Sequence, residues 1–214
     1  MNLWLSSHFL VAGLFLSSSA LTPEECQPLI TPLSLADPAM MYGRFNFIMG
    51  YTDNEIYNDI LRMTQSTWMN VTPSPSGSNT VIFSEENKIN GTCVSAKVNT
   101  TIDGNTGTTT FFNSTSAFQI LPGFDGFLVF SSQNTLRNVD EMLSLLKLNR
   151  KTTVKEFNFR ALFLMGNGTS LEDSHLDHFK RQASCLGFSK DPDFIYDPKN
   201  GFCAEGEGRK IFGN

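Results

Sequence analysis

The chain has 214 residues, of which 40% are hydrophobic and 17% are charged. This composition predicts one globular domain, or at most two small ones, and excludes a disordered or fibrous chain. The 16 Lys and Arg against 21 Asp and Glu argue against a protein that binds nucleic acid or docks on anionic membranes, because both need a basic surface. The chain has 19 Phe but only 2 Trp. Phe provides apolar area without a polar group, so we expect a large apolar lining.

The N-terminus has the pattern of a secretory signal peptide. Residues 1–20 contain no Asp, Glu, Lys or Arg, their middle part is mostly apolar, and the small residues Ser18, Ser19 and Ala20 end it. An N-terminal membrane anchor is the alternative, which the short apolar run disfavours, and no other segment is apolar over the length that a bilayer requires. We therefore expect a protein secreted to an extracellular fluid such as plasma or mucus.

Four cysteines follow the signal peptide, namely Cys26, Cys93, Cys185 and Cys203. An even number in an exported protein predicts two disulfide bonds, and the spacing leaves all three pairings open. A zinc site is the alternative, but the chain has no C-x-x-C motif to favour it.

Five N-x-[ST] sequons agree with export and predict a glycoprotein. Glycans must point into solvent, so these positions should also mark the outside of the fold. Pro73 directly follows the first sequon, which makes that site the least favourable one. The predicted glycosylation sites are Asn70, Asn90, Asn99, Asn113 and Asn167.

Between about residues 41 and 165 the hydrophobic pattern has a period of two, which is typical of β-strands. Clusters of Gly, Pro, Asn and Ser, such as residues 72–78 and 122–126, separate the strands. About eight short strands at regular spacing predict an all-β barrel or sandwich. The clearest strand segments are 44–47, 80–84, 93–102, 108–112, 117–121, 127–131 and 157–163.

Two segments have helical spacing instead. Residues 138–148 place Val139, Met142, Leu143 and Leu146 on one face, and we expect a short helix that covers one end of the barrel. In residues 170–187, Leu176, Phe179, Ala183 and Leu186 recur on one face, which predicts an amphipathic helix on the barrel exterior.

The start of the second helical segment and the C-terminal residues of the chain give two further expectations. Ser170 and Asp173 resemble a capping box that would begin the helix. The residues after 204 are rich in Gly and charge. We expect a folded domain over residues 21–204 and a flexible tail over 205–214.

Strand alternation indicates which side chains face the interior. In the last strand Phe157, Phe159, Ala161 and Phe163 share the apolar side, and in the first strand Phe45 and Phe47 do so. Phe83 and Glu85 share a face of the third strand, whereas Glu86 should point to solvent. Trp68 alternates with Met69 and should face outward. A closed barrel of about eight strands can hold one small ligand, although plain core packing is the alternative for each single Phe.

Signs of catalysis are weak. His175 and His178 are the only histidines after the signal peptide, and they lie on the exterior helix, where solvation is far commoner than metal binding. The sequence has no G-x-S-x-G, P-loop or H-E-x-x-H motif. We expect no enzymatic activity, no cofactor and no metal.

Several short segments resemble one protein family. Residues 185–188 and 201–203, which follow the amphipathic helix, resemble the C-terminal end of the alpha-1-acid glycoproteins. Residues 42–45 stand where lipocalins carry a G-x-W motif, with Phe in place of Trp, and residues 54–58 and 72–73 match the first hairpin of the same proteins. Over essentially its whole mature length the chain resembles the lipocalin family. Within it, the chain is most similar to the alpha-1-acid glycoproteins and the organotin- and toxin-binding proteins of fish.

The resemblance implies a fold, a disulfide pairing and a binding site. The fold is an all-β, eight-stranded antiparallel up-and-down barrel with a C-terminal α-helix packed outside, and the disulfides are Cys26–Cys185 and Cys93–Cys203. Residues 134–153 look longer than the corresponding loop of the alpha-1-acid glycoproteins at the open end, so residues 138–148 could act as a lid. Strand alternation and the resemblance together suggest as ligand-binding residues Phe47, Tyr57, Met69, Phe83, Glu85, Phe111, Phe130, Phe159 and Phe163.

A cavity lined by Phe with one carboxylate and one phenol suits an apolar or cationic amphiphile. The resemblance thus implies a monomeric secreted carrier of small lipophilic or amphiphilic compounds, including organotin-like xenobiotics and alkaloid toxins, with no nucleic-acid partner and no membrane span. The alternative is a glycosylated plasma protein of the alpha-1-acid-glycoprotein type that acts through its surface or in immune modulation. The two hypotheses differ in whether the barrel contains a cavity.

Overall fold

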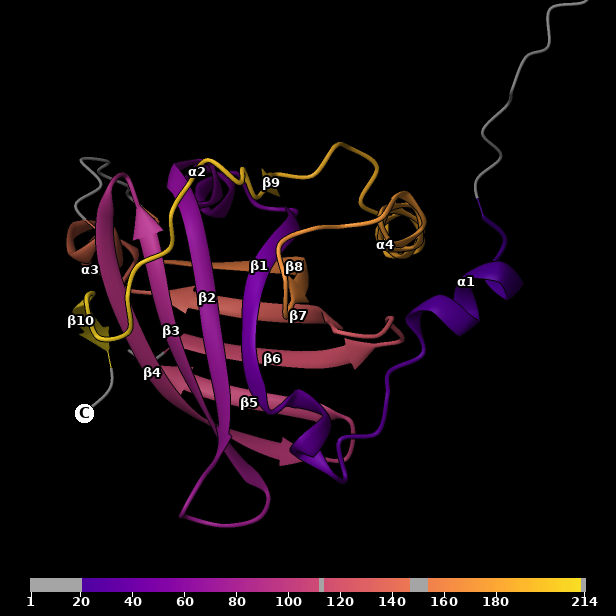
Figure 1. The fold of residues 1–214 in the computed structure, drawn as a ribbon, viewed down its shortest axis with the longest axis horizontal. Helices are drawn as coiled ribbons and strands as arrows, with labels where there is room; N and C mark the ends of the chain where they lie inside the picture. Colours follow the sequence, from indigo (N-terminus) through magenta and orange to yellow (C-terminus); the bar gives the residue numbers. More distant parts are fainter. Residues whose placement is uncertain (1–20, 112–113, 147–153, 213–214) are drawn as a thin grey trace, which may run out of the picture.

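The computed structural model describes residues 21–111, 114–146 and 154–212, so the predicted signal peptide and Asn113 lie outside the described residues. Eight consecutive strands form a closed antiparallel barrel, because each strand pairs with its neighbours in sequence and β8 returns to β1 (Figure 1). The barrel strands are β1 (Gly43–Thr52), β2 (Thr64–Pro73), β3 (Thr80–Ile89), β4 (Thr92–Asp103), β5 (Thr106–Phe111), β6 (Ser114–Leu121), β7 (Phe127–Arg137) and β8 (Glu156–Gly166). The all-β barrel predicted from the sequence is confirmed.

The base of the barrel is filled with apolar side chains. Val71, Val81, Ile120 and Leu128 point inward there and pack with Phe45, which is the position that the family resemblance assigned to the barrel base. The chain before β1 closes this end. It forms the 3-10 helix η1 (Pro38–Met41), and the backbone N–H groups of Leu33 and Leu35 donate hydrogen bonds to the carbonyls of Ile120 in β6 and Gly104 in the β4–β5 turn. The base is therefore core, and free space is confined to the other half of the barrel.

A β-bulge in β1 changes what this strand presents to each side. The register with β8 shifts between Phe47 and Met49. Phe47 faces the interior, whereas Met49 and Tyr51 belong to the apolar layer outside the barrel. Gly50 returns to the interior, where a Cβ atom would lie 2.6 Å from the Phe47 ring and 3.0 Å from the Phe163 ring. Glycine at this position makes room for two large aromatic rings.

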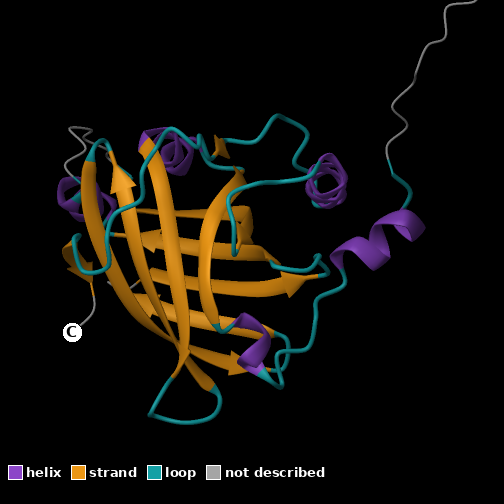
Figure 2. Ribbon diagram, in the orientation of Figure 1, coloured by secondary structure: helices purple, strands orange, loops and turns teal. Residues whose placement is uncertain are grey.

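The helix α4 (Asp173–Cys185) packs on the outside of the barrel, as predicted (Figure 2). Its buried Phe179 and Ala183 contact the outward faces of β1, β7 and β8, where Leu162 and Leu164 are fully buried. The predicted capping box is wrong: the N-cap residue is Glu172, whose side chain makes no capping hydrogen bond. Packing of the apolar face, more than capping, fixes this helix.

A short N-terminal helix, α1 (Pro23–Ile30), follows the expected cleavage point and lies against α4. Thr22 and Glu25 form a capping box at its start. The Cys26–Cys185 disulfide joins the two helices, and the buried Gln182 amide donates hydrogen bonds to the carbonyls of Leu29 (2.8 Å) and Pro122 (2.7 Å). The sequence analysis did not predict α1.

Two helices cover the end of the barrel opposite the base. The helix α3 (Val139–Leu145) lies in the predicted segment 138–148, although it is shorter; residues 147 and 148 and the Met142 side chain lie outside the described residues. The helix α2 (Glu55–Met63) lies where the family resemblance implied the first hairpin. The hairpin is present, because β1 and β2 pair antiparallel on either side of α2. Asn54 begins the helix by accepting hydrogen bonds from the backbone N–H groups of Ile56 (2.9 Å) and Tyr57 (3.2 Å).

The C-terminal segment crosses back over the barrel. The short strand β9 (Phe194–Ile195) pairs with β1, and β10 (Arg209–Phe212) pairs in parallel with β4. Residues 209–212 of the predicted tail thus pair with the barrel, and the flexibility of residues 205–214 stays a prediction. The Cys93–Cys203 disulfide tethers this segment to β4, so both disulfides have the pairing that the family resemblance implied.

The predicted glycosylation sites lie in different environments. Asn90, Asn99 and Asn167 are exposed, whereas Asn70 is half-buried. Exposure is compatible with modification, and glycosylation stays a prediction. No helix within the described residues is long and apolar enough to cross a membrane.

Removing the Cys26–Cys185 disulfide should lower stability strongly. The bond closes a loop with a sequence separation of 159, so the double variant Cys26→Ser/Cys185→Ser should lose ~3–5 kcal/mol of unfolding free energy in urea titrations. The variant Ser184→Ala at the exposed neighbouring position is the control and should unfold like the wild type. A loss below ~1 kcal/mol would mean that the disulfide itself contributes little to the stability of the folded chain.

Candidate functional site: a cavity in the barrel

The upper half of the barrel, between the filled base and the helices α2 and α3, contains a cavity of about 310 Å³. This volume is at the lower end of the range for small-molecule sites. Inward-facing residues of the barrel strands form the wall, α2 contributes Tyr57, Ile60 and Leu61, and Leu146, just after α3, lies at the end. The four Phe residues that could have filled the barrel, Phe47, Phe83, Phe111 and Phe163, surround this space instead.

Aromatic rings dominate the wall and lock one another in place. Phe47 and Phe163 meet edge to face with centroids 5.3 Å apart, and Phe118 meets Phe130 in the same way at 5.2 Å. Phe47 also stacks on Phe194 of β9 at 4.3 Å, outside the residues that line the cavity. Because such pairs fix ring orientations, the apolar part of the cavity is preformed.

Polar side chains on the wall largely satisfy one another. Thr67 donates a hydrogen bond to Asn87 (2.8 Å), and the hydroxyl groups of Thr100 and Thr109 are hydrogen-bonded to each other. Ser116 donates to the side chain of Asn134 (2.7 Å), which in turn donates to Ser132 (3.0 Å). Groups paired in this way cost little to bury and leave few polar atoms for a ligand.

Glu85 is the only acidic side chain among the residues that line the cavity. Its surface is partly accessible, but the strand alternation directs the side chain into the cavity. Burial raises the pKa of Glu85, and its hydrogen bond with Asn87 lowers the pKa to a smaller extent. Burial also raises the pKa of Tyr57, and the Glu85 carboxylate raises it further. Tyr57 is therefore a neutral phenol, and Glu85 is a carboxyl group that a buried cation would hold in its ionised form.

Tyr57 reaches the cavity because α2 lies across the barrel end. Its ring stacks on Phe159 of β8 with centroids 4.3 Å apart. On another side of α2 the buried Asn58 donates a hydrogen bond to Asp193. Asp193 also accepts hydrogen bonds from the backbone N–H of Thr52 (2.7 Å) and pairs with Lys190 (2.9 Å). The segment before β9 thus fixes α2 against the end of β1.

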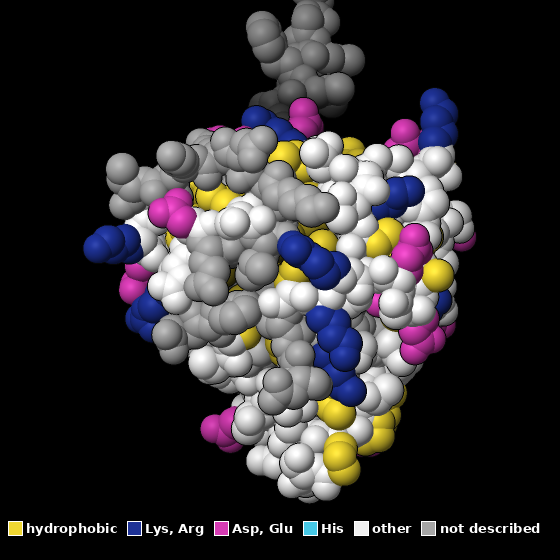
Figure 3. Space-filling view, turned by 90° about the vertical axis from the view of Figure 1, so that its left-hand side faces the viewer, with side chains coloured by type: hydrophobic (Ala, Val, Ile, Leu, Met, Phe, Trp, Pro, Cys, Tyr) yellow, Lys and Arg dark blue, Asp and Glu magenta, His cyan; other side chains and the backbone are white. Residues whose placement is uncertain are grey.

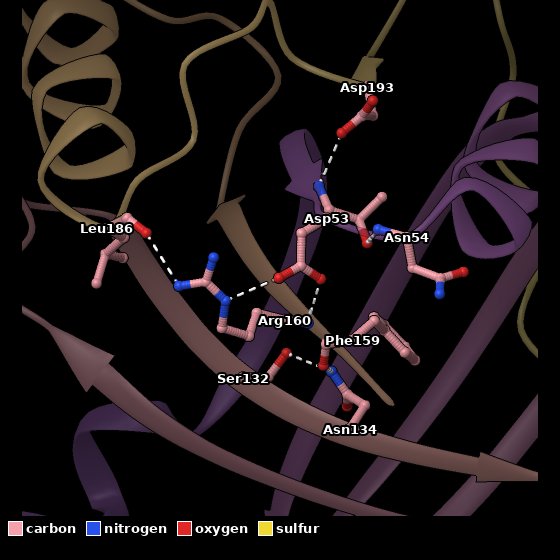
Figure 4. A network of polar contacts seen from close by, with 9 residues as sticks. Asp53, Asn54, Ser132, Asn134, Phe159, Arg160, Leu186 and Asp193 are labelled. Atoms are coloured by element: carbon pink, nitrogen blue, oxygen red, sulfur yellow. Dashed lines mark hydrogen bonds and ion pairs between the residues drawn. The ribbon is translucent and has the colours of Figure 1, made fainter. Parts of the chain in front are cut away.

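The loop between β1 and α2 is anchored separately to β8 (Figure 4). Asp53 accepts hydrogen bonds from the backbone N–H (2.7 Å) and from the guanidinium Nε (2.8 Å) of Arg160, whose Nη1 donates to the carbonyl of Leu186 at the end of α4 (3.1 Å). These contacts join the exterior helix, the β8 strand and the start of α2. They keep the covered end of the barrel together.

All nine residues suggested as ligand-binding from the sequence line this one cavity. Ligand contact by them stays a prediction. The sequence analysis missed Phe118, although it shares an inward face with Ile120, and it missed Asn87, which continues the Phe83 and Glu85 alternation. It also missed Ile211 of β10, for which the local pattern gave no signal.

Two expectations about charged side chains are decided by the structure. Glu86 was expected to be solvated but is buried, because the C-terminal segment covers it. His175 and His178 lie on the exterior helix, as expected, and the His175 ring stacks on Phe124 at 3.9 Å. Within the described residues the one cluster with metal-ligand spacing comprises Cys93, Cys203 and Glu207. Its cysteines are joined in a disulfide, so they cannot act as thiolate ligands.

Comparison with known proteins identifies the fold but no close relative. No family model and no curated protein sequence matches the chain. Among solved structures, siderocalin Q83, described as having a dual ligand binding mode, superposes with a TM-score of 0.56 at 10% identity, over 79% of this chain and 96% of that one. The odorant binding protein OBP1 superposes with a TM-score of 0.51 at 12% identity over 72% and 86%. A dog lipocalin allergen superposes with a TM-score of 0.50 at 16% identity over 68% and 86%.

The structure and these neighbours define the class: the chain has the lipocalin fold, a closed eight-stranded barrel with a C-terminal helix outside. The neighbours are lipocalins, and their names describe binding proteins. Sequence identities this low establish the fold and not the ligand.

Replacing Glu85 should change how stability depends on pH. Because burial raises the pKa of Glu85 in the folded protein, ionisation favours the unfolded state, and this destabilisation grows as the pH rises through the folded-state pKa. Glu85→Gln should therefore match the wild type near pH 4 and exceed its unfolding free energy by ~1 kcal/mol or more near pH 8. Urea titrations across this range measure the difference. A gain of equal size at both pH values would show that Glu85 is not buried as a charge.

Removing the α3 segment should accelerate ligand exchange. Val139, Leu143 and Leu146 pack against the strand ends around the cavity. A lid role for this segment predicts that deletion of residues 138–148 raises the association and dissociation rates of an apolar ligand by ~10-fold or more. Leu146→Ala tests the contact without shortening the chain. Unchanged rates in the deletion variant would reject a lid role for this segment.

Proposed function

We propose that the protein is a secreted carrier that binds one small lipophilic or amphiphilic molecule inside its barrel. The observation that carries the proposal is the preformed cavity of about 310 Å³ with a mostly aromatic wall. If side chains had filled the whole barrel, the alternative hypothesis of a protein that acts through its surface would have been favoured. A carrier needs no catalytic group and no cofactor, and we propose neither for this chain.

The wall chemistry supports a narrow class of ligands. Burying an apolar ligand surface contributes roughly 25 cal/mol per Å² before entropic costs, and aromatic faces attract cations. Glu85 and Tyr57 add one carboxyl and one phenol group to this lining. Compact apolar cations and their neutral precursors fit these features, including trialkyltin compounds and alkaloids with a protonated nitrogen.

The family resemblance supports the same ligands. From the segments 42–45, 54–58, 185–188 and 201–203 we propose that the chain is related to the fish tributyltin-binding proteins, which are related to the saxitoxin- and tetrodotoxin-binding proteins of pufferfish and to the alpha-1-acid glycoproteins. We propose a signal peptide over residues 1–20, a mature domain from residue 21, and glycans on the exposed sequons Asn90, Asn99 and Asn167. Two disulfides are typical of proteins that fold outside the cytosol.

Native mass spectrometry of the secreted, deglycosylated protein tests the proposal. We expect a one-to-one adduct with tributyltin and with some members of a panel of amphiphilic amines. Phe83→Trp/Phe111→Trp should abolish the adduct, because the larger rings occupy cavity volume. Glu85→Gln should weaken amine binding by ~10-fold and leave neutral ligands less affected.

The matched control is Ile195→Trp, which adds the same ring at an exposed apolar position outside the cavity. It should bind like the wild type. If no panel member forms an adduct with the wild type, the carrier function is wrong and a surface function of the alpha-1-acid-glycoprotein type becomes the better hypothesis. An adduct that survives the double Trp substitution would place the binding site outside the barrel.

A further inference from the structure

The wall of the barrel is incomplete between β4 and β5. These strands pair only over residues 100–103 of β4 and 106–109 of β5. Nearer the covered end of the barrel, β5 continues along β6 as far as Phe111, while β4 continues along β3 without pairing with β5. Among the described residues, the strand that pairs with this side of β4 is β10, with Arg209 opposite Val94 and Phe212 opposite Ala96.

β10 therefore supplies part of the cavity wall. Ile211 lines the cavity together with Val94, Ala96 and Phe111, which flank the gap. It is half-buried and packs with the apolar cluster that also contains α2 and α3 residues. The side of the molecule that carries β10 and α3 shows Lys and Arg side chains near its centre, with apolar side chains between them (Figure 3). Among the described residues, β10 is the strand that covers the cavity between the upper parts of β4 and β5.

A few specific contacts hold β10 in the gap. The buried Glu86 carboxylate accepts hydrogen bonds from the backbone N–H groups of Gly206 (2.9 Å) and Gly208 (3.0 Å), and Ser95 donates to the Gly208 carbonyl (2.8 Å). Gly208 fits closely, because a Cβ atom there would lie 2.6 Å from the Ser95 backbone nitrogen. A side chain at position 208 must therefore push the segment away from β4.

β10 is attached to the barrel over a short length, and a disulfide tethers the segment that precedes it. β10 has four residues and, within the described part of the chain, pairs with one strand, whereas β3 and β4 pair along ten residues of β3. The Cys93–Cys203 disulfide fixes the segment six residues before Arg209, so β10 can leave the gap without leaving the barrel. Short elements with few buried contacts open at a small fraction of the global unfolding free energy.

The covered end of the barrel is a less favourable route. There α2 is held by the Asn58–Asp193 and Asp53–Arg160 contacts, and the apolar side chains of α2 and α3 pack with one another and with the strand ends. Opening that end must break several buried contacts on two helices. Opening the side breaks the pairing of one four-residue strand and the contacts of Glu86 and Ser95 with Gly206 and Gly208, and it uncovers Ile211.

We propose that β10 is a lateral shutter of the cavity, and that ligands enter and leave between β4 and β5 when it opens. Ile211 is the residue of the shutter that contacts the ligand in the closed state. The inference rests on the proposed carrier function and adds a route and a further binding residue to it.

Hydrogen exchange tests the opening without any ligand. The amide N–H groups of Gly206, Gly208 and β10 should exchange together, at least ~100-fold faster than the N–H groups of the β3–β4 ladder. Gly208→Val should accelerate exchange of β10 and leave the ladder unchanged. Exchange of β10 only at the rate of global unfolding would overturn the shutter, whatever the ligand experiments show.

Ligand kinetics test the route. Bound tributyltin is exchanged for its deuterated form and followed by native mass spectrometry, and association is followed after rapid mixing. Gly208→Val and a chain ending at Gly208 should each raise both rates by ~10-fold or more, because a gate changes the barrier in both directions. Ile211→Ala should raise the dissociation rate alone, because it removes ligand contact and leaves the backbone hydrogen bonds of β10. Lys210→Ala, at an exposed position of the same strand, is the control and should leave both rates unchanged.

The outcomes separate the two proposals. If wild-type protein forms no adduct with tributyltin or the amines, the carrier function fails and the shutter has no ligand to gate. If the adduct forms but Gly208→Val alters neither rate while deletion of residues 138–148 alters both, ligands pass the helical end and the lateral route is wrong. If only dissociation changes in Gly208→Val, β10 is a fixed part of the wall and not a shutter.

Discussion

The closure of the barrel is the constraint on which the rest of the structure depends. Eight paired strands turn every second side chain toward one enclosed space, and that space must be either filled or left as a cavity. In the base, branched aliphatic side chains and Phe45 fill it. In the upper half the side chains are aromatic rings held against the wall by edge-to-face and stacked contacts, and Gly50 provides room for two of them. Free volume remains because these rings pack on one another along the wall.

Two consecutive carboxylates illustrate how the barrel separates functions. Glu85 and Glu86 lie on opposite faces of β3. Glu85 faces the cavity, where burial raises its pKa and a cationic ligand would compensate its charge. Glu86 faces outward but is buried under the C-terminal segment, where the backbone N–H groups of Gly206 and Gly208 donate hydrogen bonds to it. One carboxylate is thus available to a ligand, and the other fixes a strand that closes the wall.

The segments that cover the barrel, α2 and β10, could not be predicted from the alternation of apolar and polar residues. The period-two pattern of the strands and the helical spacing of residues 170–187 were sufficient to predict an all-β barrel or sandwich, the exterior helix α4 and the inward-facing rings. They were not sufficient for α2, because Tyr57, Ile60 and Leu61 acquire an apolar surface to cover only when the barrel end is present. The same holds for β10, where Arg209, Lys210 and several glycines look like a solvated tail until Glu86 and Ser95 are placed beneath them.

The sequence by itself determined the all-β class and the inward faces of the regular strands, because these follow from local periodicity. The nine suggested ligand-binding residues needed the family resemblance as well. The sequence allowed three disulfide pairings, and the resemblance to lipocalins selected the one observed. Only the tertiary structure decided that the Phe residues leave a cavity, that Glu86 is buried and that Ile211 belongs to the wall. These features depend on contacts between segments more than one hundred residues apart in sequence, and no pattern within a single segment records which distant segment will cover it.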